Sequence, residues 1–143
     1  MRDEKKFQDR FLKIVQKDGK RVFHLSPPSY PGFFDLTIMS HDHRVFNVEI
    51  KDMTGLDDKK MFKNCFTVCQ FPFYLDWLTK SPKTPFFILI KDGDEFLCDF
   101  IDNENLMKYF NMNNENIRIR FKKFEEIDEA YQWMLEQFLI MQT

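Results

Sequence analysis

Two neighbouring apolar segments carry the residues of this chain that are best suited to chemistry. Asp35 lies in the first segment, 33–39, and Glu49 and Lys51 lie two positions apart in the second, 45–51. Both segments read as strands joined by a short polar turn. Because side chains alternate between the two faces of a strand, Glu49 and Lys51 share one face. Ionisable groups among core-like residues are costly unless something binds or pairs them.

A hard divalent cation is the group that such carboxylates bind best. Bound by Asp35 and Glu49, it would activate water and polarise a phosphate, while Lys51 orients the water or stabilises charge on phosphorus. The alternative is a salt bridge between Lys51 and a carboxylate on a solvent-facing side of the hairpin. In either case the opposite strand face, with Phe46, Val48 and Ile50, is expected to be core.

The elements that must position these residues follow from periodicity and chain breakers. Phe7, Phe11, Ile14 and Val15 recur at helical spacing, and Asp18-Gly19 ends that helix. A proline-rich segment precedes the hairpin, and the continuous apolar run after it is typical of a buried strand. The expected order is helix 3–17, strand 20–25, loop 26–32, strands 33–39 and 45–51, helix 70–78, strands 86–91 and 95–100, helix 104–110, strand 117–123 and helix 125–141.

Asp35, followed after thirteen residues by Glu49-Ile50-Lys51, resembles the signature of the PD-(D/E)XK nuclease superfamily. Phe34 stands where that family often has proline. The resemblance covers roughly residues 3 to 91 and implies an α/β fold: a mixed central β-sheet flanked by helices. Its restriction-endonuclease-like core would be helix, three strands, helix, strand, with a C-terminal β-α extension. It also implies Mg²⁺ or Mn²⁺ at Asp35, Glu49 and the carbonyl of Ile50, with Lys51 assisting hydrolysis of DNA.

Two further positions follow from the same resemblance. Gln70 matches a glutamine that approaches the site at the start of the helix after E-x-K, although a surface glutamine at a helix end is an equal alternative. Glu4 matches a glutamate on the first helix that serves as a metal ligand, and its alternative is an acid favoured by the helix dipole. Small Holliday-junction resolvases are the most similar members in size, which implies branched DNA and a two-fold homodimer.

Basic and aromatic residues outside this site are the candidates for contacts to phosphates and bases. Some lie on the first expected helix. Others alternate with apolar residues along 117–123, which is expected to be a strand with one basic face. The candidate nucleic-acid contacts are Lys5, Lys6, Arg10, Lys13, Tyr30, Arg118, Arg120 and Lys122. RNA stays open as the substrate.

Length and composition bound the remaining interpretations. The 143 residues fit a single domain, with eighteen phenylalanines available for a core. No apolar run is long enough to span a membrane, and no signal peptide is evident, so a cytoplasmic protein is expected. An odd count of three cysteines favours a reducing compartment. The abundance of Phe, Lys, Asn and Ile with few Gly is typical of an AT-rich genome, such as that of a Gram-positive phage.

Charge is unevenly distributed. The chain has net charge −2, but residues 1–21 carry eight basic and four acidic side chains, while 124–143 carry five acidic side chains and no Lys or Arg. Such asymmetry suits a protein with one face toward phosphate, and equally two ordinary helices with solvated outer faces. The acidic closing helix also carries a stripe that suits either core or a docking surface: Tyr131, Met134, Leu135, Phe138 and Met141.

Other chemistries have weaker support. His41 and His43 lack a second pair of ligands at zinc spacing, and Cys65 and Cys69 are expected to be buried free thiols. His24, at the end of an apolar strand, is expected to be structural. The rival functions are a non-catalytic binding or adaptor protein that uses the same fold, and a nuclease subunit that requires a partner chain.

Overall fold

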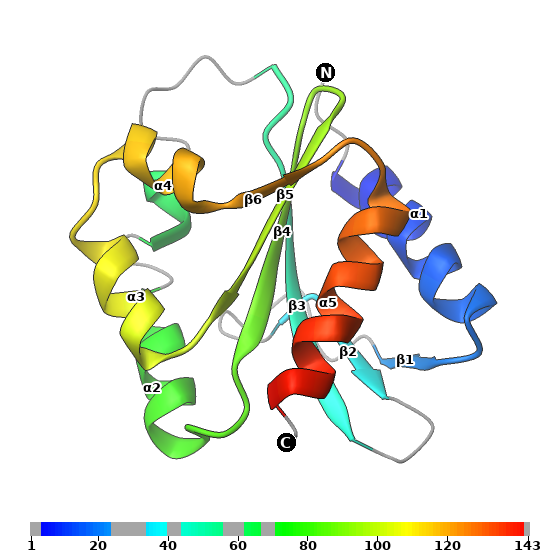
Figure 1. Cartoon of the computed structure of the whole chain (residues 1–143), viewed down its shortest axis with the longest axis horizontal. Coiled ribbons are helices and arrows are strands. Elements are labelled where there is room, and N and C mark those ends of the chain that lie inside the picture. The colour runs from blue at the N-terminus through cyan, green and yellow to red at the C-terminus, as the bar shows by residue number, and fades with distance from the viewer. Residues whose placement is uncertain (1–3, 24–33, 40–43, 56–61, 67–70, 142–143) are drawn as a thin grey trace.

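The computed structural model describes residues 4–23, 34–39, 44–55, 62–66 and 71–141. This part of the chain contains both helices and strands (Figure 1). The elements are α1 (Glu4–Lys17), β1 (Arg21–Phe23), β2 (Leu36–Met39), β3 (Val45–Asp52), the 3₁₀ helix η1 (Lys63–Phe66), α2 (Phe71–Lys80), β4 (Phe86–Asp92), β5 (Glu95–Ile101), α3 (Asn103–Phe110), α4 (Asn114–Arg120), β6 (Lys122–Phe124) and α5 (Ile127–Met141).

In the described residues, six strands form one mixed sheet in the order β1-β2-β3-β4-β5-β6. Neighbouring strands are antiparallel except β3 and β4, which are parallel. A parallel pair needs a crossover, and α2 lies within the connection between these two strands. The predicted α/β class, with a mixed central sheet flanked by helices, is therefore confirmed.

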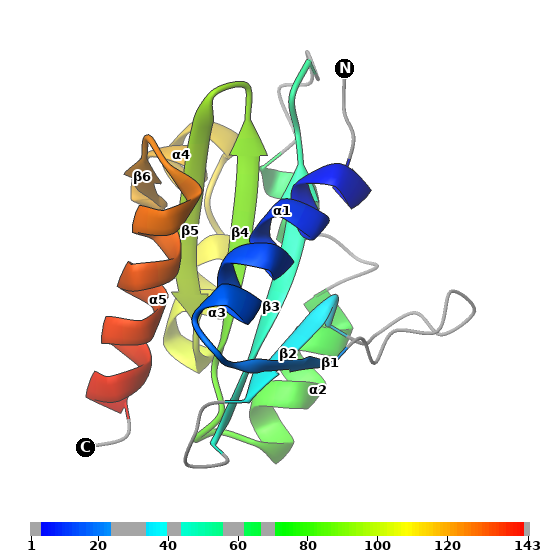
Figure 2. The ribbon, with the colours of Figure 1, turned by 90° about the vertical axis from the view of Figure 1, so that its right-hand side faces the viewer.

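Helices cover both faces of the sheet. α1 and α5 lie on one face, and α2, α3 and α4 lie on the other (Figures 1 and 2). The predicted core residues Phe46, Val48 and Ile50 point toward α1 and α5, within one buried apolar cluster. A second buried cluster, around Tyr74 and Phe86, fills the opposite side. Because β3 is covered on both faces, Glu49 and Asn47 are buried, while Val45 and Lys51 at the two ends of the same strand face are partly exposed.

The helix ends follow the chemistry of their residues. Gly19 adopts φ +79°, a left-handed conformation that glycine reaches without a side-chain clash, and its N–H donates to the carbonyl of Gln16. Asp102 begins α3, because its side chain accepts a hydrogen bond from the N–H of Asn105 at 2.8 Å. These local signals fix where α1 ends and where α3 begins.

The strand predicted over 117–123 is wrong. Residues up to Arg120 form helix α4, and only Lys122–Phe124 form a strand, β6. Asn113 caps α4 by accepting a hydrogen bond from the N–H of Asn116 at 2.8 Å. Ile119 is 79% exposed, although alternation in a strand would have buried it beside Ile117. The helix cap therefore prevails over the apparent period of two.

The closing helix packs as part of the core. Tyr131, Met134 and Phe138 are buried, and Leu135 and Met141 pack against the same cluster. This arrangement counts against the reading in which that stripe is an open docking surface for a partner chain. In the described part of the chain, no helix combines the length and apolar character that crossing a membrane requires.

Candidate metal site

The site is centred on the half of β3 that extends past the end of β2. The ladder between these strands ends at the pair Leu36–Val48, whereas β3 continues to Asp52. In that half of β3, side-chain carboxylates accept hydrogen bonds from backbone N–H groups. The Asp35 Oδ2 accepts a hydrogen bond from the N–H of Ile50 at 2.7 Å, just before β2 begins.

The second donor in this half of β3 is satisfied by the first helix. The Glu4 Oε1 accepts a hydrogen bond from the N–H of Asp52 at 3.1 Å. The N–H and C=O of one strand residue point to the same side, so the carbonyl of Ile50 also faces the side of Asp35. Carboxylate and carbonyl oxygens therefore meet along one edge of β3.

Glu49 lies beside Asp35 on the sheet face that α2 covers. It is 8% exposed, and the hydroxyl of buried Tyr74 donates to its Oε2 at 3.4 Å. Burial raises the pKa of Glu49 above its usual range, and a hydrogen bond with the Asp35 carboxyl and that group's charge raise it further. The two acids are thus close enough to share a proton when no cation neutralises them.

Lys51 follows Glu49 on the same face of β3 and is half-buried. Its ammonium opposes the other effects by lowering the pKa of Glu49. It also acts on Cys65, whose thiol pKa burial raises to about 12. The Lys51 ammonium therefore lies near the two acids, although its charge does not return the pKa of Glu49 to its usual value.

These residues fit a hard divalent cation. Mg²⁺ is commonly held by one or two carboxylates with water and phosphate oxygens completing its shell, and Asp35 and Glu49 supply two. The fit rests on the pair, because within the described ranges no group of three His, Cys, Asp or Glu is arranged to hold a metal. Glu4 influences the pKa of Glu49, but its carboxylate binds the β3 backbone at Asp52.

Three residues around the site were not anticipated from the sequence. Tyr74 contacts Glu49. Buried Cys65 lies close enough to Glu49, Lys51 and Glu4 for their charges to influence its thiol pKa. Asn47, also on the Glu49 face, is buried and its Oδ1 accepts a hydrogen bond from the Thr37 hydroxyl at 2.6 Å. The sequence could have indicated Asn47, since a polar residue two positions before Glu49 in a strand must share its face. For Tyr74 and Cys65 the sequence shows only an apolar pattern, which does not indicate a place at the site.

Several predicted residues do not belong to this cluster. Gln70 and Tyr30 lie outside the described residues, as do Cys69 and the three histidines. Lys5, Lys6, Arg10 and Lys13 are exposed on α1, whose first residue, Glu4, reaches the site. Cys65 is buried and its thiol is not part of a disulfide, as predicted.

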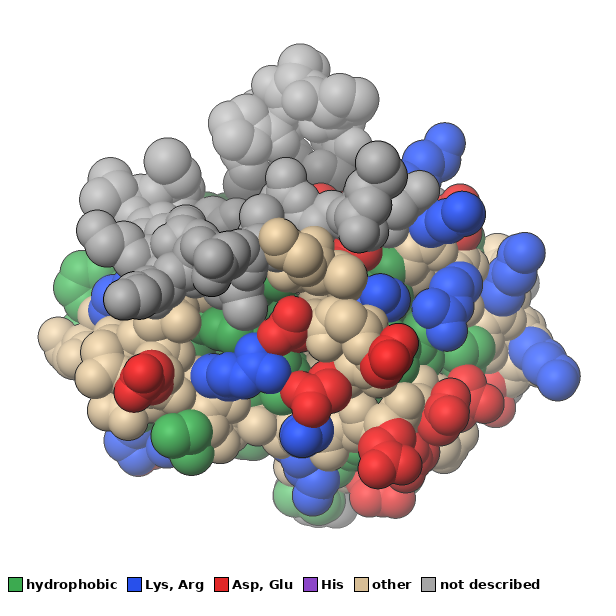
Figure 3. All heavy atoms as spheres, turned by 90° about the horizontal axis from the view of Figure 1, so that it is seen from above, with side chains coloured by type: hydrophobic (Ala, Val, Ile, Leu, Met, Phe, Trp, Pro, Cys, Tyr) green, Lys and Arg blue, Asp and Glu red, His purple; other side chains and the backbone are tan. Residues whose placement is uncertain are grey.

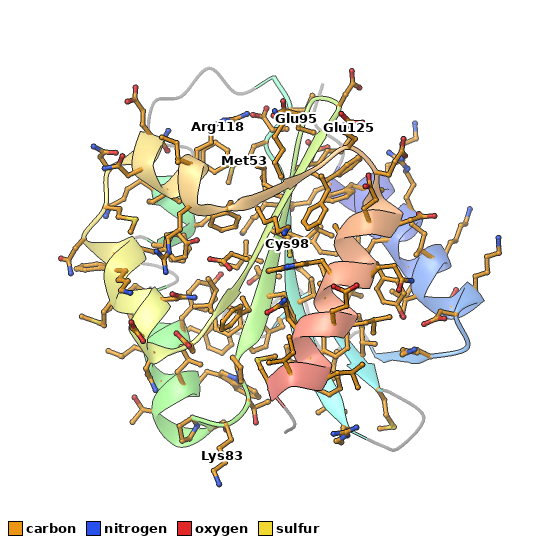
Figure 4. All side chains as sticks on the ribbon, viewed as in Figure 1. Met53, Lys83, Glu95, Cys98, Arg118 and Glu125 are labelled. Atoms are coloured by element: carbon orange, nitrogen blue, oxygen red, sulfur yellow. The ribbon has the colours of Figure 1, made fainter. Side chains whose placement is uncertain are left out.

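The late basic residues are placed differently from the prediction of a basic strand face. Arg118 on α4 pairs with Asp92, and its Nη2 donates to the Glu95 Oε2 at 2.9 Å, beside the β4–β5 turn (Figure 4). Arg120 donates to the Asn105 Oδ1 at 2.7 Å. Both guanidinium groups are therefore engaged within the fold. Of the three late basic residues in the prediction, Lys122 is the one that lies on β6.

The comparisons with known proteins give no independent indication of function: no family model matches the chain, and no curated protein matches its sequence.

Proposed function

We propose that this protein is a Mg²⁺-dependent nuclease that hydrolyses phosphodiester bonds in DNA. One observation carries the proposal: Asp35 and Glu49 form a hydrogen-bonded carboxyl pair at the part of β3 that extends past the end of β2, with Lys51 beside them. Two acids with such mutual repulsion are stabilised by a shared divalent cation.

The roles divide among the chain's own groups. Asp35 and Glu49 would hold Mg²⁺ or Mn²⁺, with the carbonyl of Ile50 as a further oxygen on the same side. When bound, the cation polarises the scissile phosphate and lowers the pKa of an attacking water. Lys51 orients that water and stabilises charge on the phosphorus. The Tyr74 hydroxyl donates a long hydrogen bond, 3.4 Å, to one oxygen of Glu49 and so favours one orientation of this carboxylate.

The order of elements supports the same proposal. From α1 to β4 the structure has a helix, three antiparallel strands, a helix and a strand parallel to the third. This order, with Asp35 before the second strand and Glu49-Ile50-Lys51 on the third, supports the proposal of a restriction-endonuclease-like core of the PD-(D/E)XK type. The function still depends on the site, because one fold serves many activities.

The substrate contacts belong to the same end of the molecule as the site. Lys5 and Lys6 follow Glu4 in the first turn of α1 and are exposed there. Arg118 and Arg120, in contrast, are held by residues of their own chain. Phosphate contacts from the start of α1 agree with backbone-directed cleavage, with branched or junction DNA and a two-fold homodimer as the more specific proposal.

The decisive experiment compares cleavage of labelled single-stranded, duplex, flap and four-way-junction DNA by wild type and Glu49→Gln. We expect cleavage with Mg²⁺ or Mn²⁺ that disappears in the variant and in EDTA. Asn47→Asp serves as a control that keeps Glu49 while adding an acid on the same face. If no DNA is cleaved and Mg²⁺ does not raise the melting temperature, the fold instead serves a non-catalytic binding protein.

A further inference from the structure

A cavity of about 280 Å³ lies at the end of the sheet where the parallel strands β3 and β4 both begin. Val45, the first residue of β3, and Pro85, just before β4, line it. The last turn of α5 contributes Phe138 and Met141. Glu49 lies four residues further along β3 than Val45, about 13 Å away at about 3.3 Å per residue. The cavity is therefore separate from the candidate metal site.

Positive charge lies beside the apolar lining of this cavity. Among the described residues that line it, two are cations, Arg44 and Lys83, and none is an acid. The Arg44 guanidinium lies over the ring of Phe138, 5.7 Å from the ring centroid. Within the described residues, the Lys83 ammonium forms no ion pair. A cation next to apolar groups is less screened than one in bulk water, so it attracts an anion more strongly.

Hydrogen bonds hold the segment that carries Lys83, between α2 and β4. The N–H of Ser81 donates to the carbonyl of Trp77 at 2.8 Å, and the N–H of Thr84 donates to the carbonyl of Ser81 at 3.0 Å. The Trp77 Nε1 donates to the carbonyl of Thr84 at 2.8 Å. Pro82, just before Lys83, restricts the backbone further. Because the backbone on both sides of Lys83 is held in place, ordering it on binding costs little.

The opposite end of the sheet has a different pattern of charge. Figure 3 looks onto that end and shows acidic and basic side chains next to one another. Arg118 pairs there with Asp92 and Glu95. Lys83 lies at the other end of the molecule from Glu95 and Arg118 (Figure 4). The Arg118 charge is therefore matched within the chain, whereas Lys83 is available to a ligand.

We infer that this cavity binds a small organic anion, with one carboxylate or phosphate group on a short apolar body. Arg44 and Lys83 hold the anionic group, since a guanidinium matches the paired oxygens of either group and an ammonium adds further donors. The apolar body lies against Val45, Phe138 and Met141. A bare inorganic anion would leave those side chains uncovered. The inference does not depend on the proposed nuclease activity.

The volume of the cavity limits the size of the ligand. A water molecule takes about 30 Å³ in the liquid, so about 280 Å³ holds roughly nine or ten non-hydrogen atoms. Ligand pockets usually measure about 300 to 1,000 Å³, so this one is at the small end. Octanoate and phenyl phosphate have the appropriate size. A ligand with so few atoms makes few contacts, and binding in the millimolar range is expected.

A phosphate of a nucleic acid is the competing occupant of the two cations. A nucleic-acid backbone presents a row of phosphates, which proteins bind with several Lys and Arg. The side chains near this cavity are instead apolar. Leu139 and Ile140 in the last turn of α5 are 59% and 63% exposed, and Val45 is 36% exposed. The surroundings therefore favour a ligand with a single anionic group over a polyanion.

The test is an NMR titration that follows backbone amide shifts of isotope-labelled protein. EDTA is present so that no divalent cation at Asp35 and Glu49 attracts the anion. We expect octanoate or phenyl phosphate to shift the amides around the cavity. Inorganic phosphate and octanamide, the neutral isostere, should bind at least about 5-fold more weakly. A preference for octanoate or for phenyl phosphate identifies the anionic group, and either preference supports the inference.

Chain length tests the enclosed shape of the cavity. From butanoate to octanoate, affinity should rise about 4-fold for each methylene that becomes buried. Decanoate should bind no more tightly than octanoate, because the cavity is then full. Affinity that keeps rising beyond octanoate overturns the inference, since it indicates an open apolar surface in place of a cavity.

Variants test the two cations. Lys83→Gln and Arg44→Gln should each weaken octanoate binding about 5- to 10-fold, because each removes one charge from the cavity. Lys13→Gln, at an exposed position on α1, is the matched control and should bind like wild type. Circular dichroism melts check that the variants are folded. Lys83 is exposed, so Lys83→Gln keeps the test decisive even if Arg44→Gln fails to fold.

Three further results overturn the inference. The first is that neither octanoate nor phenyl phosphate shifts the amides around the cavity. The second is that Lys83→Gln binds octanoate as tightly as wild type and Lys13→Gln. The third is that a DNA oligonucleotide shifts the same amides and displaces octanoate, with its affinity lost in Lys83→Gln. That third result would assign the two cations to nucleic acid.

Discussion

The Asp35 carboxylate accepts a hydrogen bond from the backbone N–H of Ile50 at 2.7 Å, which joins the two parts of the candidate signature. The same carboxyl group contacts Glu49. Asp35 therefore has two roles. It accepts the hydrogen bond of a β3 N–H group that lies beyond the end of β2, and it places a second acid beside Glu49. The structural role and the chemical role can be separated, because an amide oxygen accepts a hydrogen bond but carries no charge.

Asp35→Asn should keep the fold and abolish cleavage, since the amide oxygen can still accept from Ile50 while the negative charge is lost. Removing repulsion from Glu49 should also raise the melting temperature of the metal-free protein. Asp35→Ala removes the acceptor as well, and it should cost about 1 to 3 kcal/mol of unfolding free energy because the N–H of Ile50 loses its partner. Urea denaturation in EDTA measures both. Equal destabilisation by the two variants would contradict the capping role.

Tyr74→Phe should weaken metal binding without disturbing the fold. The ring of Tyr74 packs against Phe86, 4.7 Å between centroids, and phenylalanine preserves that contact. Only the hydroxyl that donates to Glu49 is lost. One hydrogen bond contributes about 0.5 to 1.5 kcal/mol, so the Mg²⁺ concentration at half-maximal stabilisation should rise about 2- to 12-fold.

A thermal shift titration with Mg²⁺ measures this change in Tyr74→Phe. Thr79→Val, on the exposed side of the same helix, is the control for effects on α2 itself. An unchanged Mg²⁺ midpoint in Tyr74→Phe would show that the hydroxyl does not orient the carboxylate.

The sequence predicted the α/β class and most elements of the described fold, because periodicity and breakers are local. The helix over 3–17 and the buried strand over 86–91 depend on apolar spacing and on Gly or Pro at their ends, and the structure has α1 and β4 there. The strand prediction for the segment 117–123 was wrong for a local reason as well. Alternating Ile and Arg matched a strand, while the Asn113 cap that favours a helix was overlooked.

The geometry of the candidate site is less local and was only partly predictable. Strand alternation correctly placed Glu49 and Lys51 on one face, and the structure brings Asp35 to Glu49. The contacts of Tyr74 and Glu4 depend on how α2 and α1 dock against the sheet, which no short pattern specifies. The position of Arg118 between two acids likewise required the β4–β5 turn to meet α4.

Arg118→Ala should lower stability and leave nucleic-acid binding unchanged. Its guanidinium bridges Asp92 and Glu95 and covers the ring of Phe62, 5.0 Å from the centroid. The network is partly exposed, so its loss should cost about 1 kcal/mol, which corresponds to roughly 3 °C in melting temperature. Lys122→Ala, an exposed basic control, should change neither stability nor fold. Weaker DNA binding by Arg118→Ala, with an unchanged melting temperature, would instead return Arg118 to the substrate surface.

The metal-free protein should lose stability as the pH rises, and Glu49 is the residue responsible. Burial, with the adjacent Asp35, raises the pKa of Glu49 from its ordinary 4.5 to about 9. Between these values the folded protein keeps a proton that the unfolded chain has lost, so the free energy of unfolding falls as pH increases. Mg²⁺ replaces the proton, and its stabilising effect should therefore grow over the same range.

Glu49→Gln removes this titration while preserving the size of the side chain, so it is the matched control for every other ionisable group. In EDTA, wild type should be less stable at about pH 8.5 than at about pH 6, and the variant should show a smaller decline or none. Denaturation with urea at both pH values measures the difference. Parallel pH profiles for wild type and Glu49→Gln would mean that Glu49 is ionised in the folded protein. The carboxyl pair would then lack the repulsion that a divalent cation is proposed to relieve.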